Sequence, residues 1–448
     1  MEIDPASQRA APTRPHRIVV VGGGAAGLEL VTRLGDKLGR PRQADITLVE
    51  RARTHLWKPL LHAVAAGSMD PAEHELNYMA QAHWRHFHYR YGEMIGLDRT
   101  TKQVLLGATY DEEGRQITSP RPIAYDTLVV AVGSVTNDFD TPGAAAHAVP
   151  LDTPEQAIRF NHRLVNACIR ADSQPEAVRH GQLHVAIIGA GATGTELAAE
   201  LHRTIRQLVA YGLGRIDAER DIRIVLIEAA DRILPALSPR ISAACERLLA
   251  KLGVEIRVGA RVSEVRADGV VLADGGFVPS ELVVWSAGVK APDMLRDIGG
   301  LETNRINQLV VLPTLRTTRD PDIFAIGDCA ACPRAGYETP VPPRAQAAHQ
   351  EASHLFKQLA GLLEGREPAP FVYRDFGSLV SLGRHTTIGN LMGFLGGHSM
   401  FIEGFFARLM YRSLYKMHEK AVYGSGKLLS NTLARLLVRY GEPAVKLH

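Results

Sequence analysis

Residues 17–27 read Arg-Ile-Val-Val-Val-Gly-Gly-Gly-Ala-Ala-Gly, an apolar β-branched run that ends in a glycine-rich turn. Gly22, Gly24 and Gly27 fit the pattern G-x-G-x-x-G. In this pattern the first glycine permits a tight turn, the second lets a diphosphate approach the backbone, and the third lets a helix pack closely on the strand. The helix expected from Ala25 onward would present free N–H groups and a positive dipole to that diphosphate.

A second apolar run covers residues 45–50 and ends in an acid, Glu50, 23 residues after Gly27. A carboxylate about 20 residues beyond the last glycine suits a hydrogen bond to the ribose of a bound dinucleotide. A lone glycine pattern is weak evidence, but one between a strand and a helix with a matching acid is much stronger. This part of the chain therefore predicts a dinucleotide-binding fold.

The same unit recurs 167 residues later, a separation typical of a whole domain. Residues 184–194 repeat the strand and the turn, and residues 222–228 repeat the strand that ends in an acid. The second copy carries Gly189, Gly191, Gly194 and Glu228 at the corresponding positions. Two such folds in one chain indicate two bound dinucleotides, because accidental glycines would have to recur in the same context.

Three more apolar runs end in a glycine or an acid. Two of them end in Gly133 and Gly288, each about a hundred residues after its own glycine turn. The third covers residues 322–328 and ends in Asp328. Together with the two repeated units, these runs predict an α/β protein with two Rossmann-like dinucleotide-binding domains.

Length and composition are those of a globular protein of two or three domains. The chain has 448 residues, of which 46% are hydrophobic and 22% charged, and this excludes disorder and a polytopic membrane protein. The net charge of +3 is too small to indicate a nucleic-acid partner. Four cysteines make no disulfide framework, and the pair Cys329 and Cys332 lacks the further ligands of a zinc site. We expect these cysteines to be structural, and no bound metal.

From about residue 17 to residue 384 the chain resembles the two-dinucleotide flavoprotein reductases, through both glycine turns and the Gly-Asp pair that ends in Asp328. Narrower features point to one branch. Residues 55–61 read His-Leu-Trp-Lys-Pro-Leu-Leu, residues 343–350 read Pro-Arg-Ala-Gln-Ala-Ala-His-Gln, and a basic, aromatic segment ends the chain. With these, nearly the whole chain resembles the type II NADH dehydrogenases, which are single-chain NADH:quinone oxidoreductases.

The resemblance implies two cofactor sites, with non-covalent FAD on the first glycine turn and NADH on the second. The residues implied for FAD are Gly22, Gly24, Ala25, Gly27, Glu50, Lys58, Gly133 and Asp328. Those implied for NADH are Gly189, Gly191, Gly194, Glu228 and Gly288. Glu228 also argues for NADH over NADPH, because a carboxylate repels a 2′-phosphate and Arg232 is the nearest cation that opposes this.

Gln346, His349 and Gln350 are spaced so that one face of a helix presents all three. Glutamine donates and accepts hydrogen bonds, which suits a quinone carbonyl, and histidine relays protons. An exposed polar helix face is the plain alternative, and the resemblance favours a quinone site. Glu196 opens the helix after the second turn, where it stabilises the helix dipole or, as the resemblance implies, acts near nicotinamide and flavin. These four residues are the predicted catalytic set.

The end of the chain is basic and amphipathic. Residues 401–448 carry eight Lys or Arg and three Asp or Glu. We expect a helical apolar stripe from Phe401 onward and a column of like charges from Arg408 to Lys420, which suit an anionic lipid surface, the protein's own core or a second subunit. No apolar run is long enough to span a bilayer. The prediction is a peripheral protein on the cytoplasmic face of the cell membrane.

The sequence thus predicts four segments, in which an NADH domain interrupts the FAD domain. They are a first FAD part at 16–150, the NADH domain at 151–312, a second FAD part with the quinone-site helix at 313–388, and an amphipathic membrane-association region at 389–448. The resemblance implies electron transfer from NADH to ubiquinone or menaquinone, without proton pumping, by a homodimer. Two alternatives stay open: a sulfide:quinone oxidoreductase with a reactive cysteine pair, and an NADH-responsive flavoprotein sensor.

Overall fold

The computed structural model describes residues 14–383, 386–391, 400–438 and 445. Within them the chain divides into two compact units, each built from separated stretches of sequence. The first unit comprises the residues up to His55, Leu76–Gly133 and Ala291–Tyr373. The second comprises Leu56–Glu75, Ser134–Lys290 and the residues from Arg374 onward.

A six-stranded sheet forms the centre of the first unit, in the order β23-β24-β11-β1-β2-β5. Neighbouring strands run parallel except at the β23 edge. The central strands are buried along most of their length, as in parallel sheets that helices cover. The bounds are His16–Val21 for β1, Ala44–Glu50 for β2, His88–Tyr91 for β5, Thr127–Val130 for β11, Arg316–Thr317 for β23 and Asp320–Ala325 for β24.

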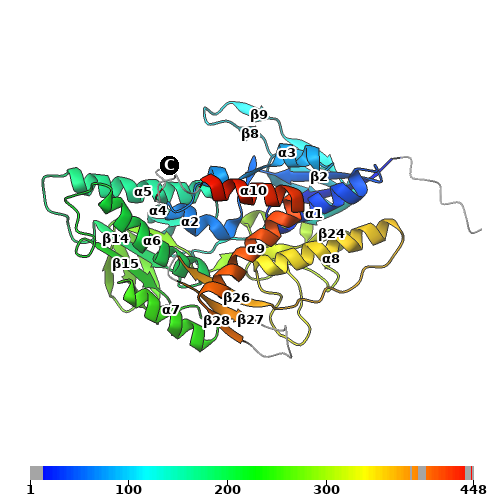
Figure 1. Cartoon of the computed structure of the whole chain (residues 1–448). Coiled ribbons are helices and arrows are strands. Elements are labelled where there is room, and N and C mark those ends of the chain that lie inside the picture. The colour runs from blue at the N-terminus through cyan, green and yellow to red at the C-terminus, as the bar shows by residue number, and fades with distance from the viewer. Residues whose placement is uncertain (1–13, 384–385, 392–399, 439–444, 446–448) are drawn as a thin grey trace, which may run out of the picture. The chain divides into compact units, whose positions relative to one another are not determined.

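Two helices of the first unit lie side by side, as Figure 1 shows: α1 (Ala25–Leu34), directly after the first glycine turn, and α8 (Ala345–Leu363). Leu28 and Leu30 of α1 are fully buried, so this helix is anchored in the core. The unit also holds α3 (Tyr78–Trp84) and a small antiparallel sheet of β6 (Met94–Asp98), β7 (Gln103–Leu106) and β10 (Arg121–Ala124).

The second unit repeats this plan with a five-stranded parallel sheet in the order β13-β20-β14-β15-β16. Its strands are β13 (Ala148–Pro150), β14 (Leu183–Ile188), β15 (Ile222–Ile227), β16 (Glu255–Arg257) and β20 (Leu282–Trp285). Between Ser134 and Lys290 it has the helices α5 (Pro154–Ser173), α6 (Ala192–Ala210) and α7 (Pro239–Lys251), among others. Helix α6 follows β14 through the second glycine turn as α1 follows β1 through the first. The predicted α/β fold with two Rossmann-like domains is confirmed.

Packing, and not order along the chain, decides which unit a segment joins. The stretch 56–75 falls in the second unit, because α2 (Leu61–Ala65) packs on α5 and α6 and Val64 enters their apolar core. The sequence placed the main boundaries at 150 and 312, whereas the units separate after Gly133 and after Lys290. Strand β13 explains the first difference, since it pairs with β20 of the second unit.

The C-terminal region begins with a sheet. Antiparallel strands β26 (Gly377–Leu382), β27 (Thr386–Leu391) and β28 (Met400–Glu403) precede the helices. The helical stripe expected from Phe401 is therefore wrong at its start, because pairing with β27 extends this stretch and Gly404, at φ +77°, turns the chain. Helices α9 (Phe405–Tyr423) and α10 (Ser425–Val438) follow. No helix in the described part of the chain is both long and apolar enough to cross a bilayer.

Candidate active site

The first glycine turn has the geometry of a diphosphate cradle. A methyl group on Gly22, at φ +103°, would overlap the backbone of Ala131, and one on Gly27 would overlap the Gly22 carbonyl. Both glycines are thus required by the protein's own packing. Gly24 differs, because a methyl group there would meet nothing within 4 Å. Its open side faces outward at the N-cap of α1, which no side chain caps, and Ala25 opens the helix. An incoming diphosphate therefore finds space and backbone donors.

Glu50 closes this turn from the end of β2. Its Oε2 accepts the Gly23 N–H at 2.6 Å, and its Oε1 accepts the Ala52 N–H at 2.9 Å. The Tyr78 hydroxyl donates to the Gly23 carbonyl at 2.7 Å, and burial raises its pKa, so it stays protonated. A carboxylate has about four lone-pair sites, so Glu50 retains capacity for a ribose hydroxyl while it holds the turn.

Two further predicted FAD residues lie at the same edge of this sheet. Gly133 follows β11 at φ +71° and has open space where a side chain would be. Gly327 follows β24 at φ +74°, next to Ala26 of α1 and Ala348 of α8, and Asp328 comes directly after it. Since β24, β11 and β1 are neighbours in the sheet, their carboxyl ends meet, which is where ligands bind in such sheets. The residues present here fit an FAD diphosphate and ribose.

Lys58 has a different setting from the rest of the predicted FAD set. It lies in the stretch 56–75 of the second unit. Its Nζ donates to the Ser134 carbonyl at 2.9 Å and pairs with Asp152 Oδ1 at 3.0 Å. The Asp152 carboxylate also accepts the Thr136 N–H. Lys58 therefore braces the start of the second unit, and its role toward flavin stays a prediction.

The second glycine turn repeats the first in detail. Methyl groups on Gly189, at φ +100°, and on Gly194 would overlap backbone atoms, whereas Gly191 is open. Glu228 accepts the Ala190 N–H at 2.8 Å and the Ala230 N–H at 3.0 Å, as Glu50 does in the first unit.

Arg232 and Gly288 are the other two residues considered for the second nucleotide site. The guanidinium of Arg232 contacts Asp231 and the Pro235 carbonyl. Gly288 adopts φ +68° after β20. The second cradle fits a dinucleotide as well as the first, and its nearby arginine already has partners.

Glu196 is almost fully buried, at 5% exposure, in α6. Its Oε1 accepts the Ser381 N–H at 2.9 Å, its Oε2 lies 3.4 Å from His62 Nδ1, and the Tyr411 hydroxyl hydrogen-bonds to it. Burial raises the pKa of Glu196, while His62 and the two hydrogen bonds oppose the rise. A solvated role at the helix dipole does not describe this residue. His62 and Tyr411 are not among the predicted site residues, although His62 directly follows the Lys-Pro-Leu-Leu run.

The three predicted quinone residues lie in the first turns of α8. Gln346, His349 and Gln350 are half-buried, while the alanines between them are buried, so the three share one accessible side of the helix. His349 Nδ1 lies 2.6 Å from Oε2 of Glu29 in α1. Glu351 is buried and accepts the Gly327 N–H at 2.6 Å. Neither Glu29 nor Glu351 is among the predicted site residues, because residue spacing does not reveal a buried carboxylate on a helix.

The cysteines have no features of a redox pair. All four are free and buried. Burial raises the pKa of both Cys329 and Cys332 to about 12, so neither forms the thiolate that attacks sulfur at neutral pH. Within the described residues, no cluster of three or more histidine, cysteine or acidic side chains is arranged to hold a metal ion.

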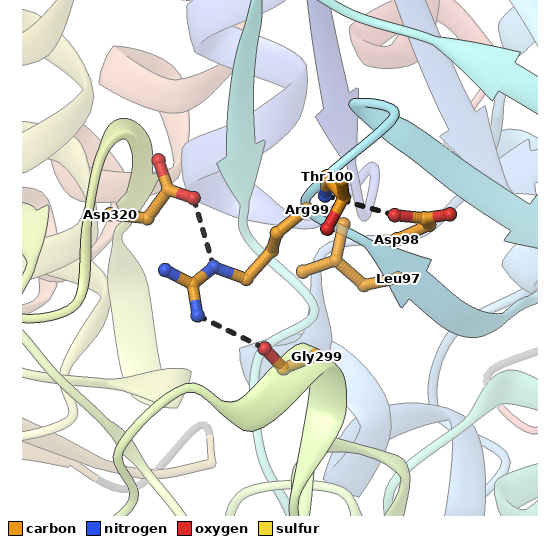
Figure 2. Close-up of a pocket in the computed structure, with 6 residues that line it drawn as sticks. All are labelled: Leu97, Asp98, Arg99, Thr100, Gly299 and Asp320. Atoms are coloured by element: carbon orange, nitrogen blue, oxygen red, sulfur yellow. Dashed lines mark hydrogen bonds and ion pairs between the residues drawn. The ribbon is translucent and has the colours of Figure 1, made fainter.

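A shallow surface pocket of the first unit lies away from these features. Figure 2 shows Arg99 in it, with the guanidinium paired to Asp320 at 2.9 Å and bonded to the Gly299 carbonyl at 3.2 Å. Asp320 begins β24, whereas Gly327 lies just beyond the other end of that strand. The pocket therefore lies at the amino-terminal end of β24, away from the carboxyl ends of the strands where the FAD residues lie, and its contacts are structural.

Comparison with known proteins now places the chain. Residues 16–352 match the family of pyridine nucleotide-disulphide oxidoreductases. The chain is 42% identical to the Type II NADH:quinone oxidoreductase of Haemophilus influenzae, over 96% of this chain and 99% of that protein. The chain belongs to the type II NADH:quinone oxidoreductases. A mycobacterial member, Ndh of Mycobacterium tuberculosis, is 29% identical over 85% of this chain and 81% of its own length.

Solved structures agree on the fold. NDH2 of Plasmodium falciparum in complex with NADH superposes with a TM-score of 0.80 at 18% identity, covering 97% of this chain and 100% of that one. The sulfide:quinone oxidoreductase of Aquifex aeolicus gives 0.71 at 16% identity, covering 97% and 96% of the two chains. The family predicted from the sequence, its oxidoreductase class and its FAD and nicotinamide cofactors are confirmed.

Proposed function

We propose that this type II NADH:quinone oxidoreductase passes electrons from NADH to a membrane quinone without moving protons across the membrane. The observation that supports this most is the pair of matching cradles. Each has two glycines that packing requires, one that is open, and a carboxylate that holds the turn. When bound, FAD supplies the two-electron chemistry that links a hydride donor to a quinone. The protein contributes binding, orientation and proton control.

The nucleotide preference rests on Glu228. Its carboxylate, at the end of β15, accepts the Ala190 N–H of the second glycine turn, and beside a bound nucleotide it would accept hydrogen bonds from ribose hydroxyls and repel a 2′-phosphate. Arg232, the nearest cation in the sequence, contacts Asp231 and the Pro235 carbonyl. NADH is therefore the expected donor, and NADPH a poor one.

The quinone is proposed to bind beside the start of α8. Gln346 and Gln350 carry amide groups that donate to quinone carbonyl oxygens, and His349 carries a proton that quinol formation consumes. Glu196, which His62 and Tyr411 contact, is proposed to act near the nicotinamide and the flavin, where its charge would affect electron transfer. The proposed acceptor is ubiquinone or menaquinone.

Membrane attachment is proposed for α9 and α10, on the cytoplasmic face. Leu409 and Met417 of α9 and Leu429 and Leu433 of α10 are exposed. Exposed lysines, among them Lys420 and Lys427, accompany them, a combination that favours an anionic lipid surface.

Part of this basic region lies outside the described residues, namely the side chains of Arg408 and Arg412 and residues 392–399, 439–444 and 446–448. We propose that the same two helices also contribute to a homodimer.

The test is quinone reduction by the purified, FAD-loaded protein. NADH should support turnover with a short-chain ubiquinone or menaquinone analogue, and NADPH should support much less. Vesicles with anionic lipid should capture the protein more than neutral vesicles, and turnover on sealed vesicles should leave the internal pH unchanged. Absence of NADH-dependent quinone reduction would refute the proposal. Flavin that NADH reduces but quinone does not reoxidise would favour the NADH-responsive sensor. Flavin that only sulfide reduces would favour a sulfide:quinone oxidoreductase.

A further inference from the structure

Glu29 is a buried carboxylate at the contact between α1 and α8. Its side chain is 1% exposed, and it comes two residues after Gly27 on the helix that begins at the FAD cradle. Its Oε2 lies 2.6 Å from His349 Nδ1. Its Oε1 accepts hydrogen bonds from Arg33 at 3.1 Å and from Ser353 at 3.3 Å. Every partner in this set belongs to the first unit.

Burying a carboxylate this deeply costs free energy unless charged or polar groups satisfy it. Arg33 and Ser353 are enough to hold Oε1, and Arg33 also donates to the Ser353 hydroxyl. Oε2 is left to His349 alone among the described contacts. Packing of α1 on α8 would be as well served by apolar side chains. Helix packing alone therefore does not explain why Glu29 is paired with His349, and we look for the explanation in the function of the histidine.

The contact fixes the ring of His349. With Glu29 ionised, its carboxylate can only accept, and Nδ1 then carries the hydrogen of the 2.6 Å contact. In the neutral ring this makes Nε2 the acceptor, and in the protonated ring Nε2 also carries a hydrogen. The side chain is 36% exposed, and no partner of Nε2 is found among the described residues. His349 follows Ala348 on α8, the helix that packs against residues 327–329 beside the predicted FAD site.

We propose that Glu29 is a positioning residue that holds His349 with Nε2 directed for proton delivery to the quinone; this rests on the proposed function. Quinol formation takes two electrons and two protons. NADH supplies both electrons and one proton as hydride, and water supplies the other proton. In this step the Nε2–H bond of protonated His349 breaks as an O–H bond forms on the quinone, and the ring regains a proton from solvent. Glu29 stabilises the charged ring before the transfer, keeps the hydrogen of the neutral ring on Nδ1 after it, and is not itself consumed.

The experiment combines two half-reactions with a spectrum of the ring. FAD-loaded wild type, Glu29→Gln, His349→Gln and the double variant are reduced with NADH and then mixed with a short-chain quinone. Glu29→Gln should leave the NADH step within about twofold and slow reoxidation about tenfold or more. A complete loss of the general acid would cost about 10²–10⁴-fold, and His349 itself remains in this variant. The double variant should match His349→Gln within about twofold, because both changes remove one function. Ser353→Ala removes its bond to Oε1 and the bond that it accepts from Arg33, but leaves the contact of Oε2 with His349 in place. It is the matched control and should leave reoxidation unchanged.

Nitrogen-15 spectra of histidine-labelled protein give a readout independent of turnover. The His349 ring, assigned by its loss in His349→Gln, should show a protonated Nδ1 in wild type and a changed tautomer ratio in Glu29→Gln. Additive effects of the two substitutions, an equal effect of Ser353→Ala, or a wild-type ring without a protonated Nδ1 would overturn the inference. A wild type that quinone fails to reoxidise would instead refute the proposed function. The wild-type spectrum remains decisive even if Glu29→Gln does not fold.

Discussion

Glu351 offers a test of buried charge beside the FAD cradle. The carboxyl is 2% exposed and accepts the Gly327 N–H at 2.6 Å. Burial, with a smaller contribution from the charge of Asp328, raises its pKa from an ordinary 4.5 to about 8, and the Gly327 hydrogen bond opposes the rise. The perturbation is Glu351→Gln, which keeps an oxygen to accept the Gly327 N–H and removes the ionisable group.

The sign of the effect follows from the raised pKa. A carboxyl that holds its proton more tightly when folded stabilises the protein below the unfolded pKa, and this stabilisation is lost as pH rises toward 8. Between roughly pH 5 and 8 the wild-type free energy of unfolding should fall by up to about 1.4 kcal/mol per pH unit relative to the variant. The total fall in the wild-type free energy of unfolding, relative to the variant, has an upper limit of about 4–5 kcal/mol, and relaxation around the ionised group reduces it. We expect the variant to exceed wild type by at least about 1 kcal/mol at pH 8.5.

The assay is denaturant unfolding of FAD-loaded protein from pH 5 to pH 9. Glu364→Gln is the matched control, since Glu364 lies just beyond the same helix, is 63% exposed and pairs with Arg366 on the surface. Its stability should follow that of wild type across the whole range. Parallel curves for wild type and Glu351→Gln would refute the reasoning, because they would mean that Glu351 is ionised in the folded protein at neutral pH.

Three further outcomes follow from the cradles and the cysteines. Gly24→Ala should fold but bind FAD at least about tenfold more weakly, whereas Gly27→Ala should lose both FAD and stability. Flavin content and thermal unfolding distinguish the two variants, and equal flavin loss without unfolding in both would contradict the geometry. Glu228→Ala should reduce the NADH-over-NADPH ratio of kcat/KM about tenfold or more, and an unchanged ratio would show that the acid does not select the nucleotide. Cys332→Ala should keep quinone reductase activity within about threefold, and iodoacetamide should not label Cys329 before unfolding; prompt labelling would contradict its burial.

Local signals carried most of the fold prediction. A strand, a glycine turn and a helix are consecutive in the chain, so the local sequence around Gly22 and Gly189 is enough to predict each turn. Each cradle places its acid at the end of the next strand, which sequence spacing also reports. The structure adds that Glu50 and Glu228 hold the backbone of their own turns, a contact that spacing alone does not reveal.

Long-range packing set the limit of prediction. The stretch 56–75 follows the first cradle in sequence but packs in the second unit, because its apolar side chains complete that core. The spacing of apolar residues from Phe401 onward predicted a helix, but pairing with a neighbouring strand extends Phe401 and Ile402. Glu29 and His349 stand 320 residues apart, so only the folded helices bring them together.

The most direct test of the central claim is double-mixing absorbance of the FAD-loaded protein, first with NADH and then with a short-chain quinone. We predict rapid bleaching of the flavin by NADH, slow bleaching by NADPH, and rapid recovery of the oxidised spectrum on mixing with quinone. A flavin that NADH leaves oxidised, or one that NADH reduces and quinone does not reoxidise, would contradict the assignment of this chain as an NADH:quinone oxidoreductase.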